Sequence, residues 1–131
     1  MNKLCSIALI FLMAISSAAG DLAGSFKEAV ALAATEDKDR ATRKYSEIDL
    51  RDYYQQKYTS VFQSCLKSTE HPDRSTFSFV VAIGTDGHVL RLYTDHETNV
   101  LACIRPTLLT DEFPHPPFAP YYMHMTMNFS K

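Results

Sequence analysis

Regular alternation of apolar and polar side chains predicts β-strands in the C-terminal half of the chain. In residues 77–83 every second side chain is large and apolar, so these side chains share one face of a strand. They are Phe77, Phe79, Val81 and Ile83. Asp86-Gly87 then supplies a pair suited to a tight turn, and residues 89–93 return as the partner strand. The pattern predicts an antiparallel hairpin.

Residues 121–129 alternate in the same way and predict a third strand with one buried side. Its apolar side carries Tyr121, Met123, Met125, Met127 and Phe129, and its other side carries Tyr122, His124, Thr126 and Asn128. Ahead of this strand, residues 113–117 read Phe-Pro-His-Pro-Pro. This segment should be an extended corner, because proline disfavours the helical conformation in the residue before it.

A helix is predicted over residues 49–68, where apolar side chains recur at steps of three and four and line one face. These side chains are Leu50, Tyr54, Tyr58, Val61, Phe62 and Cys65. Asp49 suits the N-cap, because its carboxylate can accept the free amides of the first turn. The helix should end before His71-Pro72. Cys65 falls on the apolar face and should point inward.

Two further helices are predicted on either side of these elements. The alanine-rich residues 26–34 favour helix, and Thr98 or Asn99 can cap a helix with an apolar surface of its own. Pro106 lies inside that last stretch, so we expect a kink or two short helices that meet there. Residues 36–44 are nearly all charged or polar with both signs mixed, which predicts a solvated helix or a linker.

The first residues have the composition of a secretory signal. Lys3 precedes an apolar run over residues 4–15, and Ser17-Ala18-Ala19 offers a cleavage site of small residues. We expect residues 1–19 to be a signal peptide that is removed; an uncleaved N-terminal anchor is the alternative. Residues 22–25 resemble a lipoprotein box, but serine stands where the lipid-bearing cysteine is required. The prediction is a soluble, exported, periplasmic protein without a stable membrane anchor.

Removal of this leader leaves Cys65 and Cys103, an even pair in an oxidising compartment. We expect a disulfide bond between them, with two unpaired buried thiols as the alternative. A redox role is disfavoured, because the sequence has no Cys-x-x-Cys and no base beside either cysteine. Twelve basic and fifteen acidic residues remain, a formal net charge of −3. This balance argues against nucleic acid or an anionic membrane surface as the main partner.

The segment Met123-His124-Met125-Thr126-Met127 has the composition of a metal site, since thioethers and imidazole are suitable ligands for Cu(I). In a strand, however, the three methionines face one way and His124 the other, and methionines that face a core are ordinary filler. We expect core packing and no cofactor. A periplasmic copper-binding protein is the alternative function. Zinc is disfavoured, because the five histidines are scattered without paired ligand spacing.

The sequence predicts no catalytic set, because nothing brings a nucleophile, a base and an orienting acid together. The acids of Asp95-His96-Glu97 are simply favourable charge near a helix N-terminus. An aromatic, proline-rich surface is the candidate for partner binding, because aromatic side chains are enriched in interfaces. A corner packed onto the sheet is the alternative. The candidate residues are His115, Phe118, Tyr122 and His124.

Residues 50–130 resemble the C-terminal domain shared by TolA and TonB, the periplasmic ends of bacterial envelope energy-transducing proteins. The matching features are the helix over 54–66, the strands over 79–83 and 89–92, Asp86-Gly87, the helix that bears Cys103, residues 113–117 and the strand that ends at Phe129. The resemblance implies a binding role, often by addition of a strand to an exposed sheet edge, here residues 121–129. TolA-like domains can carry a disulfide from the first strand to the second helix; here a bridge from Cys65 would join two helices. TolA and TonB proper also carry a membrane anchor and long linkers, and we expect neither here.

These patterns together predict an α+β fold, with N-terminal helices followed by a three-stranded antiparallel sheet and a packed helix. We expect a signal peptide (1–19), a helical or charged segment (20–48) and a TolA/TonB C-terminal-like domain (49–131). The expected function is a non-enzymatic protein-binding module of the periplasm. Two subtypes are open: an accessory factor of the cell envelope, and an immunity-type inhibitor.

Overall fold

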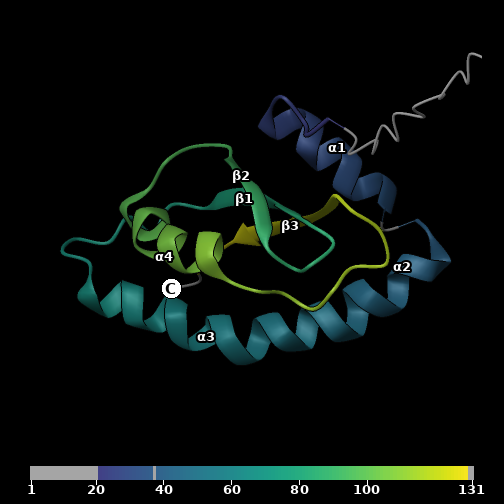
Figure 1. Ribbon diagram of the computed structural model, residues 1–131. Helices are drawn as coiled ribbons and strands as arrows, with labels where there is room; N and C mark the ends of the chain where they lie inside the picture. Colours follow the sequence, from purple (N-terminus) through teal and green to yellow (C-terminus); the bar gives the residue numbers. More distant parts are fainter. Residues whose placement is uncertain (1–20, 37, 130–131) are drawn as a thin grey trace, which may run out of the picture.

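The computed structural model describes residues 21–36 and 38–129, so the predicted signal peptide lies outside the described residues. The elements are α1 (Phe26–Glu36), α2 (Arg40–Lys44), the π-helical turn η1 (Tyr45–Leu50), α3 (Arg51–Ser68), β1 (Phe77–Ile83), β2 (Val89–Thr94), α4 (Asn99–Thr110) and β3 (Tyr121–Met127). α2, η1 and α3 follow one another without a break and form one long helical rod, residues 40–68 (Figure 1). The predicted mixture of helices and antiparallel sheet is confirmed.

β1 is the central strand of a three-stranded antiparallel sheet with the order β2-β1-β3. The predicted hairpin turns at Gly87, whose φ of 84° lies in the left-handed region. A Cβ atom there would also lie 2.0 Å from the carbonyl oxygen of Phe113. Both constraints require glycine at this position. The short distance also shows that the hairpin packs directly on the segment after α4. β3 ends at Met127, two residues before the predicted end of this strand.

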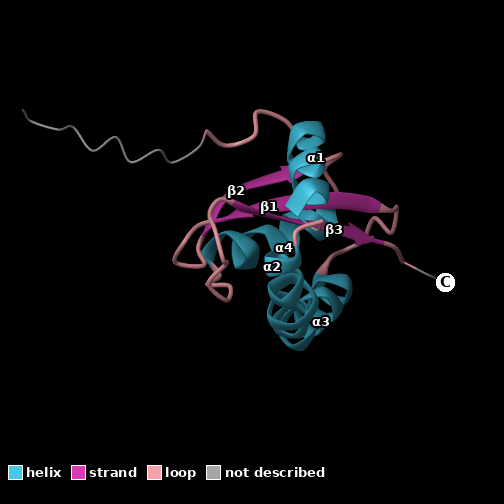
Figure 2. Ribbon diagram, turned by 90° about the vertical axis from the view of Figure 1, so that its right-hand side faces the viewer, coloured by secondary structure: helices cyan, strands magenta, loops and turns pink. Residues whose placement is uncertain are grey.

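Helices cover both faces of the sheet (Figure 2). On one face, alternate side chains of β1 form the main core with α3 and α4; these side chains are Phe77, Phe79, Val81 and Ile83. On the other face a smaller core joins the sheet to α1. It consists of Ala23, Ala29, Ala33, Val80, Ala82, Tyr93 and Tyr122. The expectation of one buried side for the third strand is therefore wrong at Tyr122, because α1 covers that residue.

The predicted N-cap at Asp49 is wrong. Helical backbone begins at Arg40, and Asp49 lies inside η1. The preceding turns already supply carbonyl oxygens to the amides that Asp49 was expected to cap. Near the start of the rod, the carbonyl oxygen of Asp39 accepts hydrogen bonds from the amide of Arg43 (3.2 Å) and from the hydroxyl of Thr42 (2.8 Å). The charged residues 36–44 are largely helical, and a helix is one of the two structures predicted for them.

Pro106 does not divide α4, which is one continuous helix. The hydroxyl of Thr98 caps the N-terminus of α4 by accepting a hydrogen bond from the amide of Leu101 (3.0 Å). Thr98 is one of the two residues predicted as the cap. Pro106 and Ala102 are both exposed. Water can therefore satisfy the carbonyl oxygen that the proline ring leaves without an amide partner, and the helix continues past it.

Cys65 of α3 and Cys103 of α4 form the predicted disulfide bond, with an S–S distance of 2.05 Å. The bond joins two helices that pack on the same face of the sheet. A sequence separation of 38 residues makes the closed loop a long one. On the chain-entropy model, such a loop stabilises the fold by about 4 kcal/mol.

Simultaneous Cys65→Ser and Cys103→Ser substitution should lower the free energy of unfolding by about 2–4 kcal/mol without changing the fold, because the cross-link restricts mainly the unfolded chain. Chemical denaturation of both proteins measures the difference. Free thiols at both Cys65 and Cys103 of the unreduced protein would contradict the bond itself, and mass spectrometry with and without reductant detects them.

Candidate functional site

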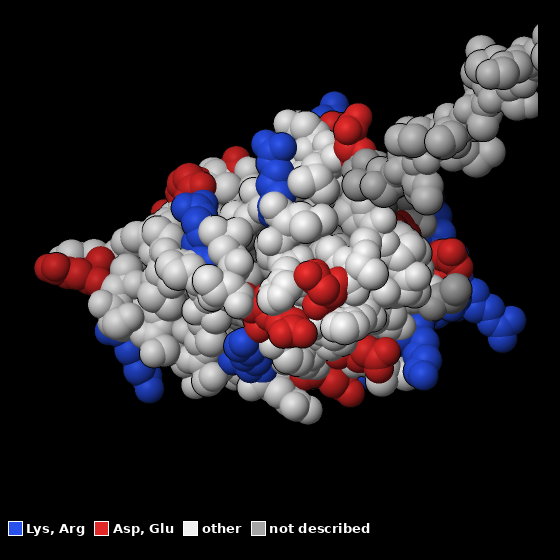
Figure 3. All heavy atoms as spheres, viewed as in Figure 1, with Lys and Arg blue, Asp and Glu red and all other residues white. Residues whose placement is uncertain are grey.

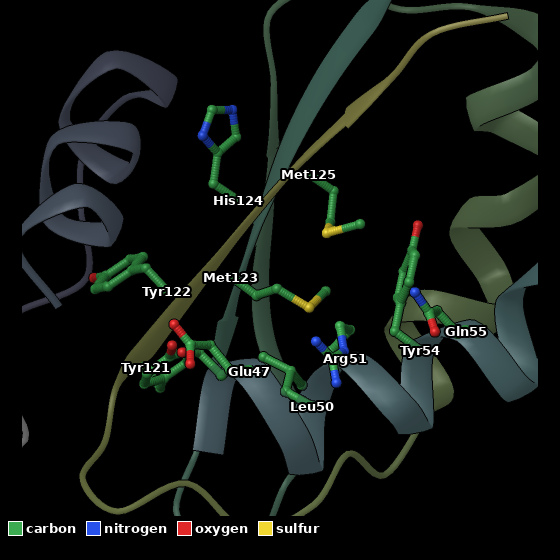
Figure 4. A pocket seen from close by; sticks show the side chains of 11 residues that line it. Glu47, Leu50, Arg51, Tyr54, Gln55, Tyr121, Tyr122, Met123, His124 and Met125 are labelled. Carbon is green, nitrogen blue, oxygen red and sulfur yellow. The ribbon is translucent and has the colours of Figure 1, made fainter. Parts of the chain in front are cut away.

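A groove of about 540 Å³ lies between β3 and the helical rod. We call it the β3 groove. It is lined by Ser46, Glu47, Leu50, Arg51, Tyr54 and Gln55 of the rod and by residues 121–125 of β3 (Figure 4). This volume is in the range of ligand-binding clefts.

The surface of the β3 groove is mainly apolar. Leu50 and Met123 are buried, and Tyr54 and Met125 are partly buried. Figure 4 shows both methionine side chains pointing from β3 toward the rod, with Tyr54 across the space from them. Glu47, Arg51 and Gln55 add polar groups from the rod. An apolar surface with few polar groups can bind apolar side chains and fix their orientation.

The backbone of β3 beside this groove has an open edge. The amide of Tyr122 donates to Oε2 of Glu36 (2.8 Å) and so points away from β1. Backbone groups of alternate residues in an antiparallel strand point to the same side, so the amides and carbonyls of His124 and Thr126 also point away from β1. Within the described sheet no strand follows β3 on this side. The edge can therefore accept another strand.

A π-helical turn shapes the wall of the groove. η1 supplies Ser46, Glu47 and Leu50 to the lining. Tyr45 in the same turn packs edge-on against Tyr121 (ring centroids 4.9 Å apart), and its hydroxyl donates to the carbonyl oxygen of Pro114 (2.8 Å). Burial raises the pKa of Tyr45, so this hydroxyl remains a donor. π-helical turns occur frequently at functional sites, which strengthens the case for the groove.

The four residues predicted for partner binding do not form one patch. His115 is exposed, 3.8 Å from Glu112, and Phe118 packs beside Tyr121 (ring centroids 5.8 Å apart). His124 is exposed on the other side of β3, near Phe26 of α1 (ring centroids 6.2 Å apart). The side chain of Tyr122 is buried under α1, so this residue is open to a partner only through its backbone. Its hydroxyl accepts the amide of Ala23 (3.0 Å).

The methionines of β3 share one side, as predicted, and pack on the main core. Met123 and Met125 also line the β3 groove. The sulfur of Met127 accepts a hydrogen bond from the hydroxyl of Tyr54 (3.8 Å). His124 points away from all three sulfurs, as Figure 4 shows for Met123 and Met125. The described residues contain no group of three histidine, cysteine or acidic side chains that could hold a metal ion.

Ser75, His96 and Asp95 lie in a row that resembles a hydrolytic triad. The Ser75 hydroxyl is 3.5 Å from Nε2 of His96, and Nδ1 of His96 is 3.0 Å from Asp95. The amides that could stabilise an oxyanion are already used, since Ser75 donates to Asp73 (2.9 Å) and Asp73 donates to Asn99 (2.8 Å). His96 and Asp95 are also exposed. This row is a loop-ordering network rather than a candidate active site.

Asp111 is the most buried carboxylate in the described part of the chain and joins α3 to the end of α4. Its two oxygens accept hydrogen bonds from the hydroxyls of Tyr53 and Tyr58 (2.6 Å each) and from the ammonium of Lys57 (2.5 Å). Burial alone would raise the pKa of Asp111. The three donors outweigh that effect and hold the pKa below its usual value. Every acceptor is occupied, so the network is structural and holds the rod in place.

The face seen in Figure 3 carries lysine and arginine side chains interspersed with aspartate and glutamate, and much of it is uncharged. This face shows no continuous basic surface of the kind that binds a phosphate backbone. None of the helices in residues 21–36 and 38–129 is long and apolar enough to span a membrane.

Comparison with models of protein families, with curated proteins and with solved structures found no match for this chain. The geometry of the β3 groove and of the open β3 edge is therefore the basis for assigning a function.

The Asp111 network predicts a loss of stability in acid. The folded state holds the pKa of Asp111 below that of the unfolded chain, so the unfolded chain binds more protons as the pH falls below about 4. The stabilisation is present above that pH and is lost as the pH falls through the folded-state pKa. Asp111→Asn should have a flatter stability profile between pH 4 and pH 2 than the parent, measured by urea denaturation.

Asp52→Asn is the matched control, because the Asp52 carboxylate is exposed and bonds only to the adjacent Arg51 in the described structure. Its profile should follow that of the parent. Asp111→Ala should in addition lower stability at neutral pH by about 1–3 kcal/mol, since it leaves the buried Tyr58 hydroxyl without its acceptor. An Asp111→Asn profile as steep as the parent's would contradict the proposed role of this carboxylate.

Proposed function

We propose that the protein is an exported, non-enzymatic protein-binding module that captures an extended segment of its partner along β3. The observation that carries this proposal is the juxtaposition of the open β3 edge with the apolar β3 groove. Backbone amides and carbonyls of the edge supply affinity for any strand. The groove beside them takes alternate side chains of that strand and supplies selectivity.

The ends and the walls of the site define the segment that it accepts. The amide of Tyr122 already donates to Glu36. A bound strand would therefore form its hydrogen bonds with the backbone of His124 and Thr126. Side chains of the bound strand that face the rod contact Leu50, Met123 and Met125 and should be apolar. Methionine side chains adapt to different shapes, which suits recognition of apolar character rather than of one residue type.

The resemblance to the TolA and TonB C-terminal domains supports a binding role and an envelope location. The leader-like N-terminus and the Cys65–Cys103 disulfide fit an exported protein, since such bonds persist in oxidising compartments. We propose a periplasmic location on these grounds. Within it, an accessory envelope factor and an immunity-type inhibitor both use a module of this kind, and the identity of the partner separates them.

Affinity capture with the tagged protein from periplasmic and envelope extracts identifies the partner, and two variants at His124 test the mode of binding. His124→Pro removes an amide that points away from β1, so the sheet keeps its internal hydrogen bonds. A bound strand would lose its hydrogen bond to that amide and would clash with the proline ring. Binding should weaken at least roughly tenfold, measured by calorimetry with the captured partner.

His124→Ala is the matched control, because it removes the imidazole and keeps the amide. Its affinity should stay near that of the parent. Thermal melts monitored by circular dichroism establish that both variants are folded. Equal weakening by the two variants would assign recognition to the side chain and contradict strand addition. Unchanged binding in His124→Pro would show that the partner does not use this edge.

A further inference from the structure

We propose that the β3 groove is also a site for one Cu(I) ion, bound by the thioether sulfurs of Met123 and Met125. Both side chains leave β3 on the same side and point toward the helical rod (Figure 4). This inference does not rest on the proposed protein binding. The ion uses the sulfurs of Met123 and Met125, whereas strand addition takes its hydrogen bonds from the backbone edge of β3; side chains of a bound strand would contact the same two methionines.

The geometry of a strand brings the two sulfurs within reach of one ion. Residues two apart on a strand face the same way with Cα atoms about 7 Å apart. Rotation about the Cα–Cβ and Cβ–Cγ bonds moves each sulfur, so both sulfurs can turn toward a common point between the two side chains. Met123 is 5 % exposed and Met125 is partly buried, so a bound ion would be largely shielded from water. The groove gives it a path from solvent.

The surrounding residues make the site selective for a soft ion. Zinc, calcium and magnesium prefer nitrogen, thiolate or oxygen ligands, and the described residues offer no cluster of these. Cys65 and Cys103 are joined to each other and have no free thiolate. Thioethers are soft ligands, which favours Cu(I) over these harder ions.

Three neighbouring side chains, Met127, Glu47 and Arg51, lie close to the proposed site. Met127 lies on the same side of β3, but its sulfur accepts the hydroxyl of Tyr54, so it can join the ion only if that contact breaks. We therefore assign it a minor role. Glu47 and Arg51 line the groove with opposite charges, so together they do not repel a monovalent cation. His124 takes no part, because it points to the other side of β3.

The test is a Cu(I) titration of the purified full chain against a chromogenic Cu(I) chelator, under ascorbate, which leaves the disulfide intact. All samples carry Cys5→Ser and Met13→Leu, so that the N-terminal segment adds no thiol or internal thioether. The parent should bind one Cu(I) per chain. Met123→Leu with Met125→Leu should abolish this binding, because neither ligand remains, whereas Met127→Leu should weaken it less than about tenfold and His124→Ala should leave it unchanged.

Leucine matches methionine in volume, so the double variant should melt within a few degrees of the parent. No Cu(I) binding by the parent, or unchanged binding by a folded double variant, would overturn the site. Zn(II) bound as tightly as Cu(I) would overturn its assignment to thioethers. His124→Pro should keep full Cu(I) affinity while it loses the partner, so failure of this inference and failure of the protein-binding proposal are measured separately.

Discussion

Burial of β1 on both faces is the constraint on which the rest of the structure depends. Five consecutive residues of this strand, Phe79 to Ile83, are fully inaccessible to solvent. A strand of this kind needs an apolar layer on each side, and the chain supplies them from different regions. α1 comes before the strand in sequence and covers one face, while α3 and α4 flank the strand in sequence and cover the other. With β1 in the centre, β2 and β3 must be the edges.

The groove exists because the helical rod is fixed at a set distance from β3. Near α4 the rod is held by the disulfide and by Asp111, which gathers three donors from α3. At its other end Tyr45 is held by Tyr121 and by the carbonyl oxygen of Pro114. The side chains between these anchors do not fill the space along β3, and that space is the groove.

The two proposed binding modes are chemically different and meet in this groove. The outward amides and carbonyls of His124 and Thr126 favour an extended chain, while the thioethers of Met123 and Met125 favour a soft ion. A strand that covers these sulfurs and an ion bound to them compete for the same space, although they use different atoms. Both proposals concern β3. Backbone groups of this strand would bind the partner, and its methionine sulfurs would bind the ion.

The sequence by itself determined the elements. The period of two in residues 77–83 and 121–129, the glycine turn at Gly87, the helical stripe up to Cys65 and the cap at Thr98 or Asn99 are all local patterns, and they depend on backbone sterics and side-chain spacing. The pairing of Cys65 with Cys103 followed from there being only two cysteines after the predicted leader. The three methionines were correctly placed on one side of their strand.

The tertiary structure decided what these elements do together. The burial of Tyr122 depends on α1 crossing the far face of the sheet, and no pattern within residues 121–129 encodes that contact. The roles of Glu36, Glu47 and Arg51 at the edge and groove have no local signal either, because each is an ordinary charged residue of a polar segment. η1 begins where Tyr45 docks on Tyr121, 76 positions later in the printed sequence. A binding groove is a property of the gap between elements, and long-range packing alone sets the width of that gap.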